Sequence, residues 1–112
     1  EIPKKINGLI VPHAGYTFSG EVAGKAFSLI KENPPDKAII IGPSHYVYAD
    51  TALTTVLENW HTPLGKIEIF NENFPYGNLD QEHSIKNQVP FICNLQKHYN
   101  LVFLRMISFV HL

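Results

Sequence analysis

Two short apolar runs, each followed by a histidine, constrain the fold of this chain more than any other feature. The first covers residues 6–12 and leads directly into His13, while the second covers residues 38–41 and reaches His45 through Gly-Pro-Ser. Both runs are rich in β-branched residues, which is typical of strands buried in a parallel sheet. We therefore expect two buried strands that end on histidines.

A helix is expected between these two strands. Residues 21–33 carry apolar side chains at helical spacing, Ser19 is a candidate N-cap, and the prolines at 34 and 35 end the pattern. A strand, a helix and a strand over about 35 residues make a βαβ unit, in which the crossover is right-handed and the strands are parallel. The chain is therefore predicted to belong to the α/β class.

A hairpin is predicted to follow. Residues 51–60 are rich in threonine and valine and favour a strand, and residues 66–69 favour a second, shorter one. The Thr-Pro-Leu-Gly segment at 62–65 has the composition of a turn. Residues 71–81 are expected to form a loop, because they mix asparagine, glycine and proline.

The last part of the chain is predicted to form a helix and a strand. The helix covers residues 82–97 and is kinked by Pro90, because proline breaks the helical hydrogen-bond ladder. Residues 101–110 form the final strand. The apolar stripe of the helix consists of Ile85, Val89, Ile92 and either Leu95 or Gln96.

The two strand-ending histidines are candidate metal ligands. Parallel strands place their carboxyl ends at one edge of the sheet, where ligands bind in open α/β folds. Adjacent strands lie about 4.8 Å apart, so His13 and His45 can reach one ion at about 2.0–2.1 Å each. The alternative is that each histidine is only a polar turn residue. A third ligand is needed, and the candidates are His83 or Glu82; the same two residues can instead serve to begin the helix.

Other residues near the two histidines are candidates for a pocket. Tyr16 and Tyr46 bring phenol groups close to them in sequence, and Ser19 and Ser44 offer hydroxyl groups. Cys93 lies along the second helix and is expected to be a small core residue.

Charge and composition exclude several classes of partner. The formal net charge is −1, so nothing favours binding to nucleic acid or to an anionic membrane surface. No apolar run approaches the roughly 20 residues that span a bilayer, and no secretion signal opens the chain. With one cysteine the chain has no internal disulfide, which fits a reducing compartment, and we expect a cytoplasmic protein.

The motifs around these candidates resemble the Memo family. The resemblance rests on "VPHAGYTFSG", "IIIGPSH", "TPLG" and "EHSIKNQVPF", which occur in this order. It implies a fold similar to class III extradiol dioxygenases, with a central, mostly parallel sheet flanked by helices. Residues 1–112 are then expected to form a single Memo-like domain, or the N-terminal part of one.

The resemblance also has implications for the site. His13 and His45 match two histidines of the family pocket, which is implied to bind iron or copper and to take part in redox chemistry or signalling. The family pocket is completed by a later histidine and cysteine, and Cys93 does not match that cysteine. Phosphotyrosine peptides or small aromatic ligands are the implied partners.

Three functions stay open at this point. The first is a Memo-like metal-binding protein with a redox or signalling role. The second is an Fe(II)-dependent extradiol-type dioxygenase, in which His13, His45 and a third ligand such as Glu82 hold the iron. The third is a module that binds a peptide or an anion without catalysis. The oligomeric state and the substrate are not indicated by any motif.

Overall fold

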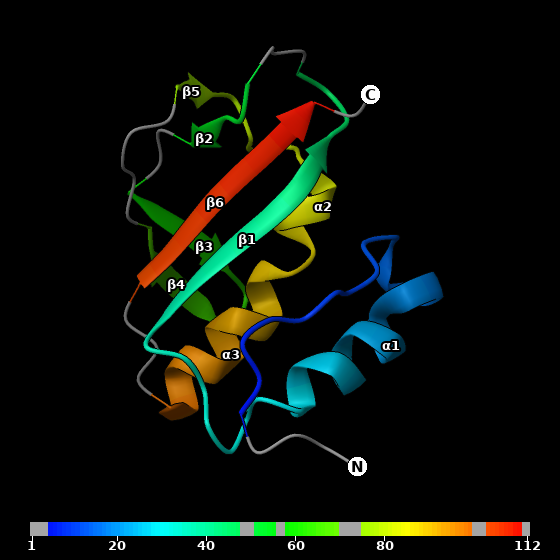
Figure 1. Cartoon of the computed structure of the whole chain (residues 1–112), viewed down its shortest axis with the longest axis vertical. Coiled ribbons are helices and arrows are strands. Elements are labelled where there is room, and N and C mark those ends of the chain that lie inside the picture. The colour runs from blue at the N-terminus through cyan, green and yellow to red at the C-terminus, as the bar shows by residue number, and fades with distance from the viewer. Residues whose placement is uncertain (1–4, 48–50, 56–57, 70–74, 100–102, 111–112) are drawn as a thin grey trace.

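The longest strands of the protein run side by side in the same direction. The computed structural model describes residues 5–47, 51–55, 58–69, 75–99 and 103–110. Strand β1 (Lys37–Ser44) pairs in parallel with β6 (Phe103–Val110), in a register that joins Lys37 to Phe103 and Ser44 to Val110 (Figure 1). Both strands were predicted from the sequence and are confirmed. Because they are parallel, their carboxyl ends lie at the same edge.

The predicted hairpin forms, but its first strand is shorter than expected. Strands β3 (Asn59–Thr62) and β4 (Gly65–Glu68) pair antiparallel, and the earlier half of the predicted strand instead gives β2 (Thr54–Thr55), which pairs in parallel with β5 (Tyr76–Gly77). The turn is closed by Thr62, whose hydroxyl donates to the carbonyl of Gly65 and accepts the N–H of Leu64. Gly65 has a φ of +131°, which favours glycine.

The predicted helix over residues 82–97 is two helices. Helix α2 (His83–Lys86) ends before Asn87, and α3 (Val89–Tyr99) begins one residue before Pro90. Proline has no N–H to donate to the preceding turn and is tolerated in the first turn of a helix, so the expected kink becomes a break. The predicted apolar stripe is confirmed, since Ile85, Val89, Ile92 and Leu95 are all buried.

Helix α1 (Tyr16–Ser28) begins earlier than predicted. Ser19 lies inside its first turns and is not the N-cap; the N-cap position is Gly15, which has no capping side chain. The Ser19 hydroxyl donates to the carbonyl of Ala14, so it ties the helix to the residue that precedes Gly15. The helix packs on α3 through Phe27, whose ring stacks on Phe91 at a centroid distance of 5.0 Å.

The prediction of a strand over residues 6–12 is wrong in the structure. The segment is extended beside β1 but forms no strand ladder with the described residues, and a cavity of about 600 Å³ lies between it and β1. Leu9 and Val11 pack against the core while Ile10 is fully exposed. The β-branched run therefore keeps the alternation of an extended chain, and the expected parallel pairing of the βαβ unit is absent here. A strand needs ladder partners, and Pro12 lacks an N–H to offer.

The core lies between the strands and helices α2 and α3, and α1 adds Phe27 to it. The architecture is a mixed α/β arrangement of three two-stranded sheets. Parallel pairing is present in the described residues as the β1–β6 and β2–β5 pairs rather than as one large central sheet. In the described ranges no helix combines the length and hydropathy that a bilayer span requires. The buried cluster comprises Phe27, Ile40, Leu53, Trp60, Ile67, Ile69, Leu79, Ile85, Val89, Ile92 and Leu95.

Candidate metal centre

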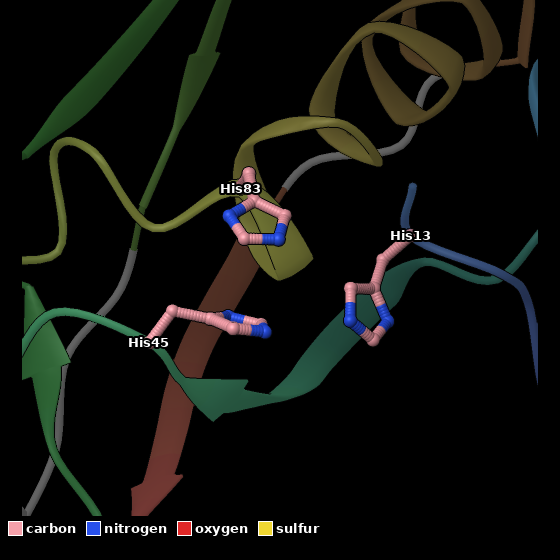
Figure 2. A group of neighbouring side chains, drawn as sticks. All are labelled: His13, His45 and His83. Carbon is pink, nitrogen blue, oxygen red and sulfur yellow. The ribbon is translucent and has the colours of Figure 1, made fainter. Parts of the chain in front are cut away.

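Three histidines from separate parts of the chain meet beyond the carboxyl end of β1. His45 directly follows β1, His83 is the first residue of α2, and His13 lies between the extended segment and α1. The ring centroids are 4.0 Å apart for His45 and His83, 5.4 Å for His13 and His45, and 5.7 Å for His13 and His83. Figure 2 shows the three rings facing one another, each with a nitrogen turned toward the space between them.

The spacing of the ring nitrogens fits a single metal ion. One nitrogen from each ring lies within 4.8 Å of the other two. Two imidazole nitrogens bound to one ion at about 2.1 Å are about 3.4 Å apart in a tetrahedral shell and at most about 4.2 Å apart. The three nitrogens would bind one ion if every separation, now within 4.8 Å, shortened to about 4.2 Å or less. His13 and His83 are half-buried and His45 is exposed, so one side of the cluster is open to solvent.

His13 is held in place by the residues at the break between α2 and α3. The side-chain amide of Asn87 donates to the carbonyls of His13 and Ala14, at 3.3 Å each, and the amide of Gln88 donates to the carbonyl of Pro12 at 3.1 Å. These bonds take the place of a strand ladder for the segment that carries His13. The loss of regular helix at the α2–α3 break thus has a positional consequence for the cluster.

Asn87 and Gln88 were not predicted as functional residues. The available signal was weak: two amide side chains stand directly before a Val-Pro pair, at the point where a helix is interrupted. Their targets lie more than 70 positions earlier in the chain, so only the tertiary structure reveals the contact.

Helix α2 contacts the end of β1 through the side chain of Ser84. The hydroxyl of Ser84 lies 2.9 Å from the carbonyl oxygen of Pro43, near the end of β1. This contact places His83 beside His45. Cys93, the one cysteine of the chain, is buried in α3 as predicted and is not part of the cluster.

Glu82 is next to the cluster but points at His45. It is the N-cap of α2, and its carboxylate contacts both the backbone N–H and the ring Nδ1 of His45, each at 2.6 Å. Burial alone raises the pKa of this carboxyl, but the hydrogen bonds from His45 and Ser84 outweigh burial and the pKa lies below its ordinary value. Glu82 is therefore an ionised hydrogen-bond acceptor, and of the two predicted alternatives for a third ligand it is His83 that shares the histidine cluster.

The four predicted pocket residues have different surroundings. The hydroxyl of Tyr46 lies 3.4 Å from Nδ1 of His83. Ser44 donates to the carbonyl of Val47 and Ser19 to that of Ala14, so both hydroxyl hydrogens are donated to nearby backbone carbonyls. Tyr16 donates to the carbonyl of Asn87 at 3.0 Å. Burial raises the pKa of the Tyr16 phenol above its ordinary value.

The fold and the cluster together define a class of protein. They describe a mixed α/β protein with three imidazoles gathered where a parallel strand ends, which is an arrangement suited to holding a metal ion. The family model described as "Memo-like protein" matches residues 1–110, and the chain belongs to this family.

Individual relatives agree with the family assignment. A MEMO1 family protein of Caldivirga maquilingensis is 40% identical over 98 residues, covering 75% of this chain and 34% of the relative. A MEMO1 family protein of Nitrosopumilus maritimus is 33% identical and covers 78% of this chain and 36% of its own length. The protein memo-1 homolog of Caenorhabditis elegans is 34% identical, covering 84% of this chain and 31% of the relative. The chain spans about a third of the length of these relatives.

Proposed function

We propose that this chain supplies the imidazole ligands of a mononuclear metal centre in a Memo-like protein, with His13, His45 and His83 as the ligands. The observation that carries the proposal is the convergence of one nitrogen from each ring within 4.8 Å. Family membership supports it, because the two motifs that carry the Memo resemblance most strongly also carry His13 and His83.

The donor set suits a first-row transition metal. Imidazole nitrogens bind iron, copper and zinc, whereas magnesium and calcium prefer oxygen. Of these metals the proposal favours iron or copper, on the strength of the Memo resemblance. Either ion, when bound, supplies one-electron redox chemistry and coordination positions on the open side of the three rings. The chain's own share is to hold the rings and to leave that side accessible.

A combined His13→Ala and His45→Ala variant tests the proposal. The parent chain, loaded with Fe(II) without oxygen or with Cu(II) and then desalted, should retain about one ion per chain, because three neutral imidazoles converge on one point. The double variant should retain little metal. His61→Ala is the matched control, since His61 is an exposed histidine in β3 outside the cluster. Equal metal content in the parent and the double variant would contradict the proposal.

A second candidate function is an Fe(II)-dependent extradiol-type dioxygenase. The observation that favours it is the cavity of about 600 Å³ beside the cluster, which His13 and mostly apolar side chains line and which has room for an aromatic ring. Oxygen consumption should then follow when catechols are added to iron-loaded protein. Absence of oxygen uptake with several catechols, in protein shown to contain iron, would leave only the metal-binding function.

The binding-module alternative has less support from the site. It needs free hydroxyl donors, but those of Ser19 and Ser44 already donate to backbone carbonyls. A phosphotyrosine peptide or a small aromatic ligand is still the proposed partner by resemblance to the Memo family. Titration of a phosphotyrosine peptide in the presence of a chelator separates the binding module from the metal-dependent functions, because binding that persists without metal favours the module.

A further inference from the structure

Hydrogen-bond donors surround the carboxylate of Glu82. The residue is only 2% exposed. Its Oε2 accepts the backbone N–H of His45 at 2.6 Å, and its Oε1 accepts the backbone N–H of Ser84 at 3.2 Å. The Ser84 hydroxyl lies 2.9 Å from both Oε1 and the carbonyl oxygen of Pro43, so its single hydrogen serves one of these two acceptors. Backbone N–H groups can only donate, so both carboxylate oxygens act as acceptors.

This arrangement decides which nitrogen of His45 carries a hydrogen. The ring Nδ1 lies 2.6 Å from Oε1, an oxygen that already accepts from Ser84. A short contact with an acceptor requires a donor, so Nδ1 carries the hydrogen. A neutral imidazole has one ring hydrogen, and Nε2 is then left with its lone pair available to a metal ion.

We propose that Glu82 is a positioning residue of the metal centre, which holds His45 in the tautomer and orientation that present Nε2 to the space shared with His13 and His83. The proposal rests on the metal-binding function proposed above. Glu82 was a candidate ligand on sequence grounds, but its oxygens are occupied by donors from His45 and Ser84. A carboxylate behind a ligating histidine raises the basicity of the ring and fixes its direction.

Glu82 and His83 work as one unit because they are adjacent in the chain. Glu82 is the N-cap of α2 and His83 is the first residue of the helix, so the same short element supplies one imidazole and orients another. Glu82 contacts both the backbone and the ring of His45, so the ring is held in one orientation relative to the start of α2. Any shift of α2 therefore moves two of the three nitrogens together.

An amide at position 82 cannot accept all the hydrogen bonds that the carboxylate accepts. Glu82→Gln keeps the shape of the side chain but replaces one acceptor oxygen by an NH₂ group. In one orientation the NH₂ group faces the N–H of His45, and in the other it faces the N–H of Ser84 and the Nδ1 of His45. The second orientation makes Nδ1 an acceptor and moves the ring hydrogen to Nε2, the nitrogen needed by the metal.

The test reads the tautomer and the metal affinity separately. Long-range ¹H–¹⁵N NMR of the metal-free full chain at neutral pH assigns the hydrogen of the His45 ring, and titration with Co(II) measures binding through its absorption bands. The parent should carry the hydrogen on Nδ1. Glu82→Gln should shift it toward Nε2 and bind Co(II) about 10–100-fold more weakly. Glu68→Gln, which removes the same charge from an exposed residue of β4, should match the parent in both measurements.

Each outcome has one meaning. A hydrogen on Nε2 but not on Nδ1 of His45 in the parent overturns the inference. This measurement needs no variant, so it holds even if Glu82→Gln does not fold. An unchanged tautomer with unchanged Co(II) affinity in folded Glu82→Gln overturns it as well. If the parent binds no Co(II), the proposed metal function fails, while the tautomer of His45 still decides whether Glu82 orients the ring.

Discussion

Gly42 and Ser84 approach each other so closely that no side chain fits between them. A methyl group on Gly42 would lie 2.4 Å from Oγ and 2.9 Å from Cβ of Ser84. This contact sets the distance between β1 and α2. Because His45 follows β1 and His83 begins α2, it also sets the distance between two members of the histidine cluster.

Gly42→Ala is predicted to destabilise the protein and weaken metal binding together. The added methyl group must push α2 away from β1, at a cost of about 1–3 kcal/mol, and the displacement carries His83 away from His45. Urea denaturation and Co(II) titration measure the two effects. Gly8→Ala is the control, since a methyl group there meets nothing within 4 Å. A Gly42→Ala variant with parental stability would show that α2 is not held by this contact.

Asn87→Ala is predicted to loosen the segment that carries His13. The substitution removes the bonds from the Asn87 amide to the carbonyls of His13 and Ala14. We expect a loss of about 1 kcal/mol in the free energy of unfolding and weaker Co(II) binding that approaches the level of His13→Ala. Asn94→Ala, at an exposed position of α3, should have neither effect. Unchanged Co(II) affinity in Asn87→Ala would mean that His13 is positioned by other contacts.

Tyr16→Phe is predicted to change how stability depends on alkaline pH. The hydroxyl of Tyr16 donates to the carbonyl of Asn87, and burial raises its pKa above the ordinary value. A raised pKa means that the contribution of the phenol to stability is complete below about pH 10, the unfolded value, and is lost as the pH rises through the folded value.

The Tyr16→Phe variant should therefore be less stable than the parent by about 0.5–1 kcal/mol near neutral pH, and the gap should narrow above about pH 10. Urea denaturation of the parent and the variant, near neutral pH and above about pH 10, measures this difference in stability. Tyr76→Phe, at an exposed tyrosine of β5, should follow the parent. A gap that is constant over this pH range would contradict the prediction.

Local patterns were sufficient for the elements whose partners are close in the sequence or whose apolar spacing is regular. The hairpin turn at Thr62 and Gly65, the β1 strand and the apolar stripe of α3 were all predicted, because turn chemistry and periodicity are properties of short segments. The break at Pro90 was anticipated as a kink for the same reason. The early start of α1 was missed because Ser19 resembles an N-cap but its hydroxyl bonds to Ala14.

The failures concern contacts between distant segments. Residues 6–12 have the composition of a buried strand, but composition does not supply a ladder partner, and the segment is held by Asn87 and Gln88 instead. The candidate site shows the same limit. His13, His45 and His83 were all candidates from sequence, whereas the contact from Glu82 to Nδ1 of His45 depends on how α2 docks on β1. That the chain is part of a longer Memo-like domain stays a prediction.

X-ray absorption at the copper edge of the Cu-loaded full chain tests the central claim most directly. The claim is that His13, His45 and His83 bind one ion through their ring nitrogens. It predicts a first shell containing about three imidazole nitrogens at about 2.0–2.1 Å, with the outer-shell scattering of imidazole rings, and about two such rings in His83→Ala. A shell of oxygen donors without imidazole scattering in the parent, or one unchanged in His83→Ala, would contradict it.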